Sequence, residues 1–497
     1  MFDKVLIANR GEIAVRVIDT CREMGIATVA VYSEVDRLAL HVLWADEAVC
    51  LGDSEPSQSY LNADRIVAAA VASGAGAIHP GYGFLSENAD FARKCADNGI
   101  EFIGPPPEVI QNFGNKMVAR QMMIDGGVPV VPGMTSPETD PGVVAAQADE
   151  IGYPVLVKAA AGGGGKGMRL VENAAELAAA MTASSSEAAA SFGDGSVYLE
   201  KFIVKPRHVE IQILADKHGR MVHLLERECS IQRRHQKIIE ETPSVALTPE
   251  LRREMGETAL RAAAAAGYVN AGTVEFILDE ENGRFYFLET NTRLQVEHPI
   301  TEMITGLDIV RRQIEIAAGL PLDLEQENIT ARGHAIECRI YAEDPASGFF
   351  PSPGTIGWLR EPVGPGIRND CGVYSGFVVP MEYDPILSKL VVHAENRDSA
   401  IARMKKALGD YMVAGVKTPI PFLSEVIDSE PFRRGETFTD FIETHFPDWQ
   451  PSFQDRELAA LAFIADAILP DEGRADADAV PSTGLPTPWQ TLGGWRL

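Results

Sequence analysis

The segment at residues 273–299 constrains the fold more strongly than any other part of the chain, because it has the pattern of a single β-hairpin. Two runs of apolar and aromatic residues, 274–278 and 285–288, flank the pair Asn282-Gly283, which is a strong hairpin signal. Two turns fit this pattern. A three-residue loop would place Gly283 in the left-handed conformation, whereas a two-residue Asn-Gly turn would shift the strand register by one residue.

The register decides whether the acidic residues of this hairpin face one another. With the three-residue loop, Glu275 lies opposite Glu289, and Asn291 and Arg293 follow on the same face. Opposed carboxylates repel and usually need a cation between them, and two glutamates with an asparagine offer hard oxygens that suit Mg²⁺. With the two-residue turn, the glutamates would be solvated. The hairpin alone leaves both interpretations open.

The composition is that of a globular protein without a membrane span. At 497 residues the chain is too long for one ordinary core, so we expect about two to four lobes. The net charge of −27 disfavours nucleic acid or anionic lipid as the main partner. We find no signal peptide and no C-x-x-C spacing among the six cysteines, so we expect a reduced cytoplasmic enzyme.

The chain changes character several times along its length. Residues 1–114 alternate strands and helices without a G-x-G-x-x-G motif, which predicts a doubly wound α/β lobe lacking a Rossmann dinucleotide site. Residues 115–330 contain many short strands; the alternation in 208–214 predicts an antiparallel sheet with one solvent-exposed face. Residues 331–445 have a mixed α+β pattern, and the acidic segment 446–497 has the composition of a linker.

A glycine-rich run at 161–168 lies between two predicted strands. It is not a Walker A loop, because Gly167 occupies the Ser/Thr position, but successive backbone N–H groups and Lys166 could cover phosphates as a lid. A flexible surface loop fits equally well. Lys158 favours the phosphate interpretation, because it ends an apolar strand where an unpaired lysine would be costly to bury.

A basic cluster at 226–241 is unexpected in so acidic a chain and suits a small anion or a nucleotide. The alternative is a solvated loop paired to Glu240 and Glu241. The cluster comprises Gln232, Arg233, Arg234, His235 and Lys237.

Further along, Glu297 follows Arg293 closely and could act as a general base if its pKa is suitable.

Taken together, these motifs resemble the ATP-grasp family and, within it, biotin carboxylases, over roughly residues 1–445. The motifs are ANRGEIA (8–14), HPGYGFLSEN (79–88), GNK (114–116), AGGGGKGMR (161–169), PRHVEIQ (206–212), ERECSIQRRHQK (226–237), NTRLQVEHPITEMITG (291–306), GHAIECRIYAED (333–344) and PSPG (351–354). The resemblance implies an α/β ATP-grasp fold: a doubly wound N-terminal lobe, a mobile glycine-loop lid at about 131–203 and a C-terminal mixed α+β lobe.

The resemblance also implies a reaction. ATP phosphorylates bicarbonate, the resulting carboxyphosphate yields CO₂, and CO₂ is trapped on N1 of a biotin carried by a protein. The expected cofactors are therefore ATP, Mg²⁺ or Mn²⁺, and biotin. This is the first half-reaction of an acyl-CoA carboxylase, catalysed by an ATP-dependent ligase.

Carried over to this sequence, the resemblance implies a role for each matching residue. ATP would be held by Lys116, Lys158, Gly163, Gly164, Gly165, Lys166, Glu200, Lys201, His208, Gln232 and His235, with Glu200 and Lys201 at the adenine. The metal ligands would be Glu275, Glu289 and Asn291, and bicarbonate would bind Lys237, Arg293, Gln295 and Val296. Glu297 would deprotonate bicarbonate, Arg339 would stabilise the developing biotin enolate, and Tyr82 would lie near the biotin ring.

Two features depart from the family pattern. Thr290 stands where the family is expected to have Met, with little consequence for the metal because residue 290 should face away from its neighbours. The C-terminal segment and YDPILSKL (383–390) resemble fused α subunits of the 3-methylcrotonyl- and propionyl-CoA type, yet no Ala-Met-Lys-Met biotin-accepting motif is present. We therefore expect a carboxylase module, either a separate subunit or a fragment, whose linker leads toward a missing downstream domain.

The expected partners are a biotin carboxyl carrier protein or domain and a carboxyltransferase subunit, in a homodimer or a larger carboxylase complex. Two alternatives remain at this point. One is another ATP-grasp ligase, such as an N5-carboxyaminoimidazole ribonucleotide synthetase or half of a carbamoyl-phosphate synthetase. The other is a nucleotide-binding regulatory subunit without catalysis, which the presence of Glu289, Arg293 and Glu297 disfavours.

Overall fold

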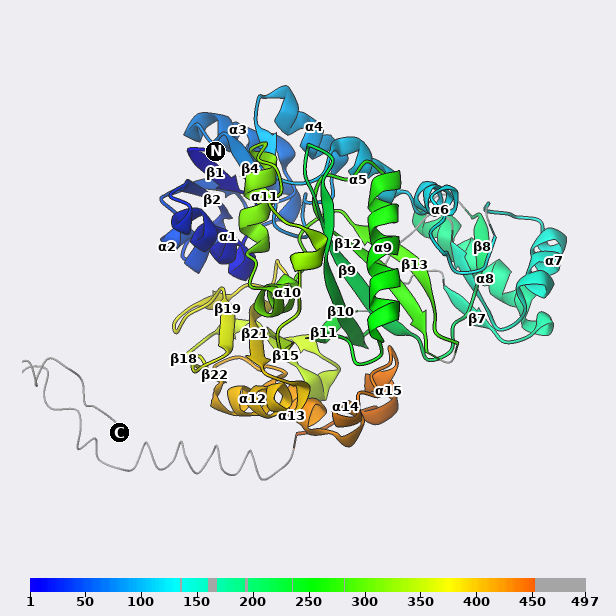
Figure 1. Ribbon diagram of the computed structural model, residues 1–497. Coiled ribbons are helices and arrows are strands. Elements are labelled where there is room, and N and C mark those ends of the chain that lie inside the picture. Colours follow the sequence, from blue (N-terminus) through cyan, green and yellow to red (C-terminus); the bar gives the residue numbers. More distant parts are fainter. Residues whose placement is uncertain (135, 160–167, 193–194, 235, 281, 452–497) are drawn as a thin grey trace, which may run out of the picture. The chain divides into compact units, whose positions relative to one another are not determined.

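The computed structural model describes residues 1–451 except residues 135, 160–167, 193–194, 235 and 281 (Figure 1). Within the part of the chain so described, we find no helix that is both long and apolar enough to cross a bilayer.

The N-terminal lobe is built on a parallel five-stranded sheet with the strand order β3-β2-β1-β4-β5. Its elements are β1 (Lys4–Ile7), α1 (Gly11–Glu23), β2 (Ala27–Ser33), α2 (Leu40–Trp44), β3 (Glu47–Gly52), α3 (Ala63–Ser73), β4 (Ala77–His79), α4 (Ala89–Asp97) and β5 (Glu101–Phe102). The chain starts in the middle of the sheet and winds outward to both edges, as βαβ connections in a doubly wound fold require. The predicted lobe is confirmed.

Two helices, α5 (Pro107–Gly114) and α6 (Lys116–Asp125), lead into the region predicted as the lid. That region contains α7 (Pro141–Ile151), β6 (Val155–Ala159), β7 (Arg169–Val171), α8 (Ala174–Phe192) and β8 (Val197–Lys201). Its three strands form an antiparallel sheet of their own, and a separate hydrophobic cluster that includes Val144, Val157 and Leu177 lies beneath them. A hydrophobic core of its own is what allows a segment to behave as a subdomain.

The largest sheet has eight strands and joins two regions that the sequence divides at residue 330. In spatial order they are β13 (Arg284–Asn291), β12 (Asn270–Asp279), β9 (Arg207–Ala215), β10 (Met221–Arg233), β11 (Gln236–Thr242), β14 (His334–Tyr341), β21 (Ile386–Ala394) and β19 (Ile367–Cys371). All neighbours are antiparallel. The sheet passes from the middle of the chain into the C-terminal lobe through the pairing of β11 with β14.

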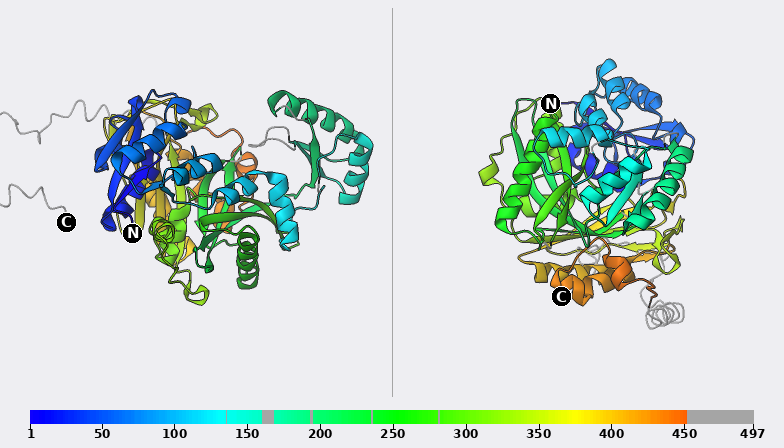
Figure 2. Two further views of the ribbon diagram at one scale, coloured as in Figure 1. Left: turned by 90° about the horizontal axis from the view of Figure 1, so that it is seen from above. Right: turned by 90° about the vertical axis from the view of Figure 1, so that its right-hand side faces the viewer.

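Helices cover this sheet at several places. Helix α9 (Pro249–Ala265) packs on β9 and β10, and α12 (Arg397–Asp410) lies beside α13 (Ile420–Asp428) against β14 and β21 (Figures 1 and 2). Helix α10 (His298–Thr305) contacts β10, β11, β14 and β21, and α11 (Ile309–Ala317) contacts β12. The remaining elements are α14 (Glu430–Arg434), α15 (Phe441–His445), β15 (Glu343–Asp344), β16 (Phe350–Pro351), β17 (Gly354–Thr355), β18 (Trp358–Arg360), β20 (Val378–Val379) and β22 (Met412–Ala414), with short 3₁₀ turns at 34–36, 56–58, 326–328 and 345–347.

The hairpin of β12 and β13 has a longer turn than predicted. The last cross-strand pair is Asp279 with Arg284, so residues 280–283 connect the strands. The Asn282 side chain accepts a hydrogen bond from the Arg284 backbone N–H, and Gly283 has a φ of +66°. Glycine is thus in the predicted left-handed conformation, but the predicted three-residue loop is wrong.

The two hairpin glutamates nevertheless face each other. Near the turn the register places Phe276 opposite Phe287, and one residue further it places Glu275 opposite Glu289. A β-bulge at Leu288 separates these pairs and supplies the one-residue shift that the predicted loop would have given. The pairing of Glu275 with Glu289 is confirmed, although its cause is the bulge and not the turn.

The expectation of one solvent-exposed face on β9 is wrong. The strand alternates apolar and polar residues as predicted, but every one of its residues is buried, including Glu210 and Gln212 with no exposed surface. Burying polar side chains requires partners for them. These partners are the charged groups of the site.

Candidate active site

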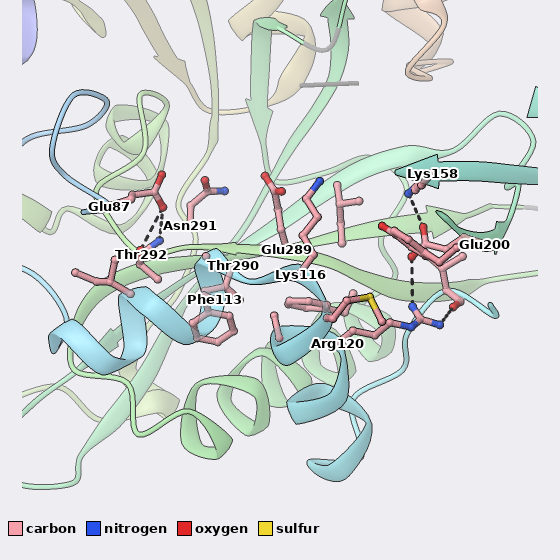
Figure 3. Close-up of a pocket in the computed structure, with 18 residues that line it drawn as sticks. Glu87, Phe113, Lys116, Arg120, Lys158, Glu200, Glu289, Thr290, Asn291 and Thr292 are labelled. Atoms are coloured by element: carbon pink, nitrogen blue, oxygen red, sulfur yellow. Dashed lines mark hydrogen bonds and ion pairs between the residues drawn. The ribbon is translucent and has the colours of Figure 1, made fainter. Parts of the chain in front are cut away.

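A pocket of about 280 Å³ lies among α6, the lid strands and β13 (Figure 3). The predicted nucleotide and metal residues that line it are Lys116, Lys158, Glu200, Glu289 and Asn291. Phe113, Tyr198 and Phe287 add aromatic surface. A concave site with apolar walls, two lysines and carboxylate oxygens suits an aromatic, polyanionic ligand bound together with a metal.

Lys158 is not the unpaired lysine that the sequence suggested. Its ammonium donates a hydrogen bond to Glu200, and Glu200 also receives Arg120 Nη1 at 3.4 Å (Figure 3). Arg120 in turn donates to the carbonyl of Val131 at 2.7 Å. Glu200 therefore links α6 to the first lid strand and offsets part of the positive charge of the pocket.

The other predicted nucleotide residues are distributed differently. Lys116 is exposed at the first position of α6, where the Asn115 side chain caps the helix. Lys201 donates its ammonium to the carbonyls of Gly152 and Tyr153, at 2.8 and 2.9 Å, and so braces the lid. The predicted residues Gly163, Gly164, Gly165, Lys166 and His235 lie outside the described residues.

Lys237 is the centre of a buried cluster of carboxylates. Its ammonium lies 2.5 Å from Glu210, 2.8 Å from Glu275 and 2.7 Å from Glu297. Burial alone would lower the pKa of Lys237, but these three carboxylates hold it well above its ordinary value. Lys237 is therefore a permanent cation that keeps three buried anions together.

Glu275 is fully engaged by hydrogen-bond donors. Besides Lys237, its Oε1 accepts from Asn291 at 2.8 Å and from Gln295 at 2.9 Å, while His208 Nε2 lies 2.9 Å from Oε2. Burial would raise the pKa of Glu275, but Lys237 and His208 lower it far below the ordinary value. Gln232 lies 2.8 Å from the other nitrogen of His208 and thereby fixes the ring.

The predicted metal ligands fit a hard divalent cation. Glu289 lines the pocket and lies opposite Glu275 in the strand register. Its pKa is raised, first by desolvation of the carboxylate and then by the charge of Glu275. A cation between the two would remove this repulsion, and the Asn291 oxygen adds a third hard donor. Figure 3 shows the side chains of Glu289 and Asn291 pointing one way from β13 and that of Thr290 pointing the opposite way, as predicted, although Thr290 also lines the pocket.

Glu297 sits just before α10, fully buried between two cations. Its Oε1 lies 2.7 Å from Lys237 and its Oε2 lies 3.0 Å from Arg339. Burial would raise the pKa of Glu297, but Lys237, Arg339 and Arg227 together hold it well below its ordinary value. The carboxylate is thus ionised and, while it contacts these cations, a weak base.

Arg293 and Gln295 lie at the junction between the pocket and the buried cluster. Arg293 donates to Glu87 at 2.9 Å, to the Asn291 oxygen at 2.9 Å and to the Gln295 oxygen at 2.7 Å. The Gln295 nitrogen donates to Glu275. One chain of hydrogen bonds therefore runs from the predicted bicarbonate residues to the predicted metal ligands.

The two remaining predicted residues meet at Lys389. The carbonyl of Val296 accepts from the buried Lys389 ammonium at 3.2 Å, and the Tyr82 ring centroid lies 5.9 Å from that ammonium. Tyr82 donates its hydroxyl to Glu12, which pairs with Lys389 at 2.9 Å. This network joins the N-terminal lobe to strand β21 beside Glu297.

Sequence reasoning missed several charged residues of the site. Glu210 binds both Lys237 and the fully buried Arg227, whose other donors reach Gln212 at 2.8 Å. Glu240 holds Arg339 at 2.6 Å. The signal was available for Glu210, because it alternates with apolar residues on the same face of β9 as His208, but we expected that face to be solvated.

The comparison with protein families matches three consecutive stretches of the chain. The biotin carboxylase N-terminal domain matches residues 1–110, the ATP binding domain of the carbamoyl-phosphate synthase L chain matches residues 115–325, and the biotin carboxylase C-terminal domain matches residues 337–444. The two flanking matches favour biotin carboxylase over the other ATP-grasp ligases.

Individual relatives extend over most of the chain. Biotin carboxylase 1 of Bacillus subtilis is 51% identical over 445 residues, which is 90% of this chain and 99% of that protein. The mitochondrial methylcrotonoyl-CoA carboxylase subunit alpha of rice is 51% identical over 444 residues, which is 89% of this chain and 60% of that protein.

A solved structure agrees with the fold. The biotin carboxylase domain dimer of the Hydrogenobacter thermophilus 2-oxoglutarate carboxylase, crystallised with MgADP, ADP and bicarbonate, has a TM-score of 0.86 and 50% sequence identity, covering 91% of this chain and 99% of that one. With this fold, these identities and this arrangement of charged residues, the chain belongs to the biotin carboxylase family.

Proposed function

We propose that this chain uses ATP and bicarbonate to carboxylate biotin, with the pocket of Figure 3 for the nucleotide and the Lys237 cluster for bicarbonate. The observation that carries the proposal is Glu297, a buried ionised carboxylate held between two cations beside the predicted bicarbonate residues. A base, its cations and a nucleotide pocket in continuous contact are what phosphoryl transfer to bicarbonate requires.

Bicarbonate would bind where the chain now satisfies its own charges. Lys237, Arg293, Gln295 and the backbone of Val296 offer it hydrogen-bond donors, and binding would draw Lys237 partly away from Glu297. With less positive charge nearby, the pKa of Glu297 rises and the carboxylate becomes a better base. Glu297 then accepts the bicarbonate proton as a bicarbonate oxygen attacks the γ-phosphorus of ATP.

Phosphoryl transfer forms a bond from the bicarbonate oxygen to phosphorus and breaks the bond to ADP. Lys116 and Lys158, which both line the pocket, would neutralise the phosphates. For this, Lys158 must exchange its present partner Glu200 for the nucleotide. Carboxyphosphate then breaks into CO₂ and inorganic phosphate. The released phosphate takes the proton from biotin N1, and N1 forms the new bond to CO₂.

A divalent cation would be held by Glu275, Glu289 and Asn291, the hard oxygens at the bulged part of the hairpin. When bound, Mg²⁺ or Mn²⁺ supplies charge neutralisation for the transferring phosphoryl group. The chain's own contribution is the opposed pair of carboxylates, which repel each other until a cation lies between them.

Arg339 would stabilise negative charge on the ureido oxygen of biotin, since one of its guanidinium nitrogens already faces Glu297. Tyr82, whose ring lies near Lys389, would lie beside the biotin ring. The biotin carrier would be a biotin carboxyl carrier protein or domain, and the carboxyl group would then pass to a carboxyltransferase subunit. We propose that the chain works as a dimer or within a larger carboxylase complex, as its relatives' names describe.

The domain limits follow the same proposal: 1–114 for the N-terminal domain, 115–330 for the ATP-grasp domain with its lid at about 131–203, 331–445 for the C-terminal domain, and 446–497 as a linker. The final acceptor is not fixed by this site, because the relatives that share it serve carboxylases of methylcrotonoyl-CoA and of 2-oxoglutarate.

The test is the dependence of ADP formation on each substrate. We expect full activity only when ATP, Mg²⁺, bicarbonate and biotin are all present, with isotope-labelled bicarbonate recovered in carboxybiotin. A slow bicarbonate-dependent ATPase without biotin is compatible with this mechanism. ADP formation that is indifferent to both bicarbonate and biotin would refute it.

A further inference from the structure

Two buried glutamates lie next to Arg339: Glu240 accepts a hydrogen bond from it, and Glu337 is paired with Glu240 across the strands. Glu240 on β11 and Glu337 on β14 are directly opposed in the antiparallel register, so their side chains lie on the same face of the sheet. Both have no exposed surface. Helix α10 contacts both strands.

The pair has too few hydrogen-bond donors. Arg339 Nε donates to Glu240 Oε1 at 2.6 Å. In the part of the chain that the structure describes, Glu240 Oε2 and both carboxylate oxygens of Glu337 have no hydrogen-bond partner. Buried carboxylate oxygens without donors are costly, and two ionised carboxylates side by side repel as well.

The charged groups around the pair are already engaged by other carboxylates. Lys237, whose charge also acts on Glu240, contacts Glu210, Glu275 and Glu297. On β14, Arg339 is shared between Glu240 and Glu297. On β21, Lys389 lies 2.9 Å from Glu12 and 3.7 Å from Asp370.

The remaining neighbours add no positive charge. Beside Glu297, the first residue of α10 is His298, whose pKa burial and then the nearby cations hold well below its ordinary value, so its ring is neutral. Burial and then the charge of Glu240 raise the pKa of Glu337 well above its ordinary value. Among the described groups, the missing counter-charge is therefore not a side chain.

We propose that Glu240 and Glu337 share one proton, that the protonated carboxyl donates a hydrogen bond to the other, and that this bond fixes the Glu240 carboxylate which orients Arg339. Glu337 is then a positioning residue that acts on Arg339 through Glu240. The consequence for the reaction rests on the role proposed above for Arg339 toward biotin.

The shared proton would affect how Arg339 is oriented. With one proton, the pair carries a single negative charge, which holds Arg339 by its Nε and leaves the Nη groups for the side where Glu297 lies. With no proton, two negative charges would compete with biotin for the same guanidinium. The shared proton therefore keeps Arg339 oriented and available.

Infrared difference spectroscopy tests the proton directly. At neutral pH we expect a C=O stretching band of a buried carboxylic acid in the unmodified chain, and we expect Glu337→Gln and Glu240→Gln each to remove it. Glu241→Gln is the matched control, because Glu241 is the next residue of β11 and its pKa is lowered to about 2 by His334 and Arg397 in spite of its burial. Absence of the band, or its persistence in Glu337→Gln, would overturn the proposal.

Steady-state kinetics with free biotin test the positioning. In Glu337→Met the donor to Glu240 is lost, so we expect the biotin KM to rise about tenfold while the ATP KM is unchanged. Glu337→Gln keeps a neutral donor and should restore the biotin KM to near the original value. An equal loss in both variants would overturn the positioning role, and if Glu337→Met does not fold, Glu240→Gln serves in its place.

The pH profile separates this role from a structural one. Because the pKa of Glu337 is raised, the shared proton is present at neutral pH and is lost as pH rises. The biotin KM of the unmodified chain should therefore increase at alkaline pH, whereas that of Glu337→Gln should stay flat. If instead Arg339→Ala leaves the biotin KM unchanged, the proposed role of Arg339 fails while the infrared result still decides the proton.

Discussion

The nucleotide pocket and the Lys237 cluster share the β12–β13 hairpin, yet they treat their lysines in opposite ways. In the pocket, Lys116 is exposed and Lys158 has one carboxylate partner. In the cluster, the Lys237 side chain is only 12% exposed and contacts three carboxylates. The nucleotide pocket presents the positive charge of Lys116 to solvent, whereas the positive charge of Lys237 is paired with buried carboxylates inside the protein.

This difference matches the two ligands. A nucleotide brings several negative charges and its own metal, so an open pocket with spare cations suffices to attract it. Bicarbonate is a small monoanion and must replace contacts that the chain already makes. In the proposed mechanism, the cluster would keep Glu297 a weak base until bicarbonate competes for Lys237, which would restrain phosphoryl transfer to water.

The largest expected effect comes from removing the base. Glu297→Gln keeps the shape of the side chain but cannot accept the bicarbonate proton, so we expect biotin carboxylation to fall between about a hundredfold and ten-thousandfold. The measurement is bicarbonate- and biotin-dependent ADP formation. Glu241→Gln is the control, since Glu241 too is a buried glutamate, held by the Arg397 guanidinium and the His334 ring. Equal activity of both variants would contradict the assignment of Glu297.

The second prediction concerns the stability of the fold, and its failure would contradict the difference between the open pocket and the Lys237 cluster. Lys237→Met leaves three buried carboxylates without their cation, and we expect a loss of about 3–5 kcal/mol in the free energy of unfolding. Lys116→Met, the matched change in the open pocket, should alter it by no more than about 0.5 kcal/mol. Urea unfolding at neutral pH measures both.

The pH dependence of that loss has a definite sign. In the unmodified chain the pKa values of Glu275 and Glu297 are depressed, so they contribute stability above their unfolded pKa of about 4.3 and lose it as pH falls. Without Lys237 these pKa values rise and the contribution disappears. The difference between the two chains should therefore be largest above about pH 4.3 and shrink as pH falls below that value, and a difference that grows on acidification would refute the account.

The third prediction sharpens the role of the open pocket. Lys116→Met removes a charge-assisted contact with phosphate, so we expect the ATP KM to rise between about tenfold and a hundredfold. The bicarbonate KM should not change, because bicarbonate is assigned to the other region. Steady-state kinetics with each substrate varied in turn provide the measurement, and a parallel rise in both KM values would show that the regions are not separate.

The sequence predicted the fold well where local patterns decide it. The doubly wound N-terminal lobe follows from the alternation of strand and helix patterns. The facing pair Glu275 and Glu289 was predicted as well, but from the wrong turn. The bulge at Leu288 that produces this pair could not be predicted, because one extra residue in a strand leaves no distinct trace in an alternating pattern. The hairpin prediction was right in its result and wrong in its turn.

The buried polar face of β9 shows what local patterns cannot give. His208, Glu210 and Gln212 alternate with apolar residues as solvent-exposed residues do, and only the tertiary contacts with Arg227 and Lys237 show that the face is internal. The partner of Lys158 was missed for the same reason, since Glu200 lies on a different strand. Burial depends on what packs above a strand.

The smallest expected effect tests the hairpin that the two regions share. Glu289→Gln replaces the carboxylate with a neutral amide whose single oxygen can still bind a cation, so we expect the Mg²⁺ concentration for half-maximal activity to rise only about three- to tenfold. Thr290→Val is the adjacent control: its hydroxyl is buried and without a hydrogen-bond partner among the described residues, and its side chain points the opposite way from Glu289 and Asn291 (Figure 3). Titration of activity with Mg²⁺ at fixed ATP gives the measurement. An unchanged requirement in Glu289→Gln, or an equal shift in Thr290→Val, would show that the facing glutamates do not hold the cation, and the repulsion between them would then need another explanation.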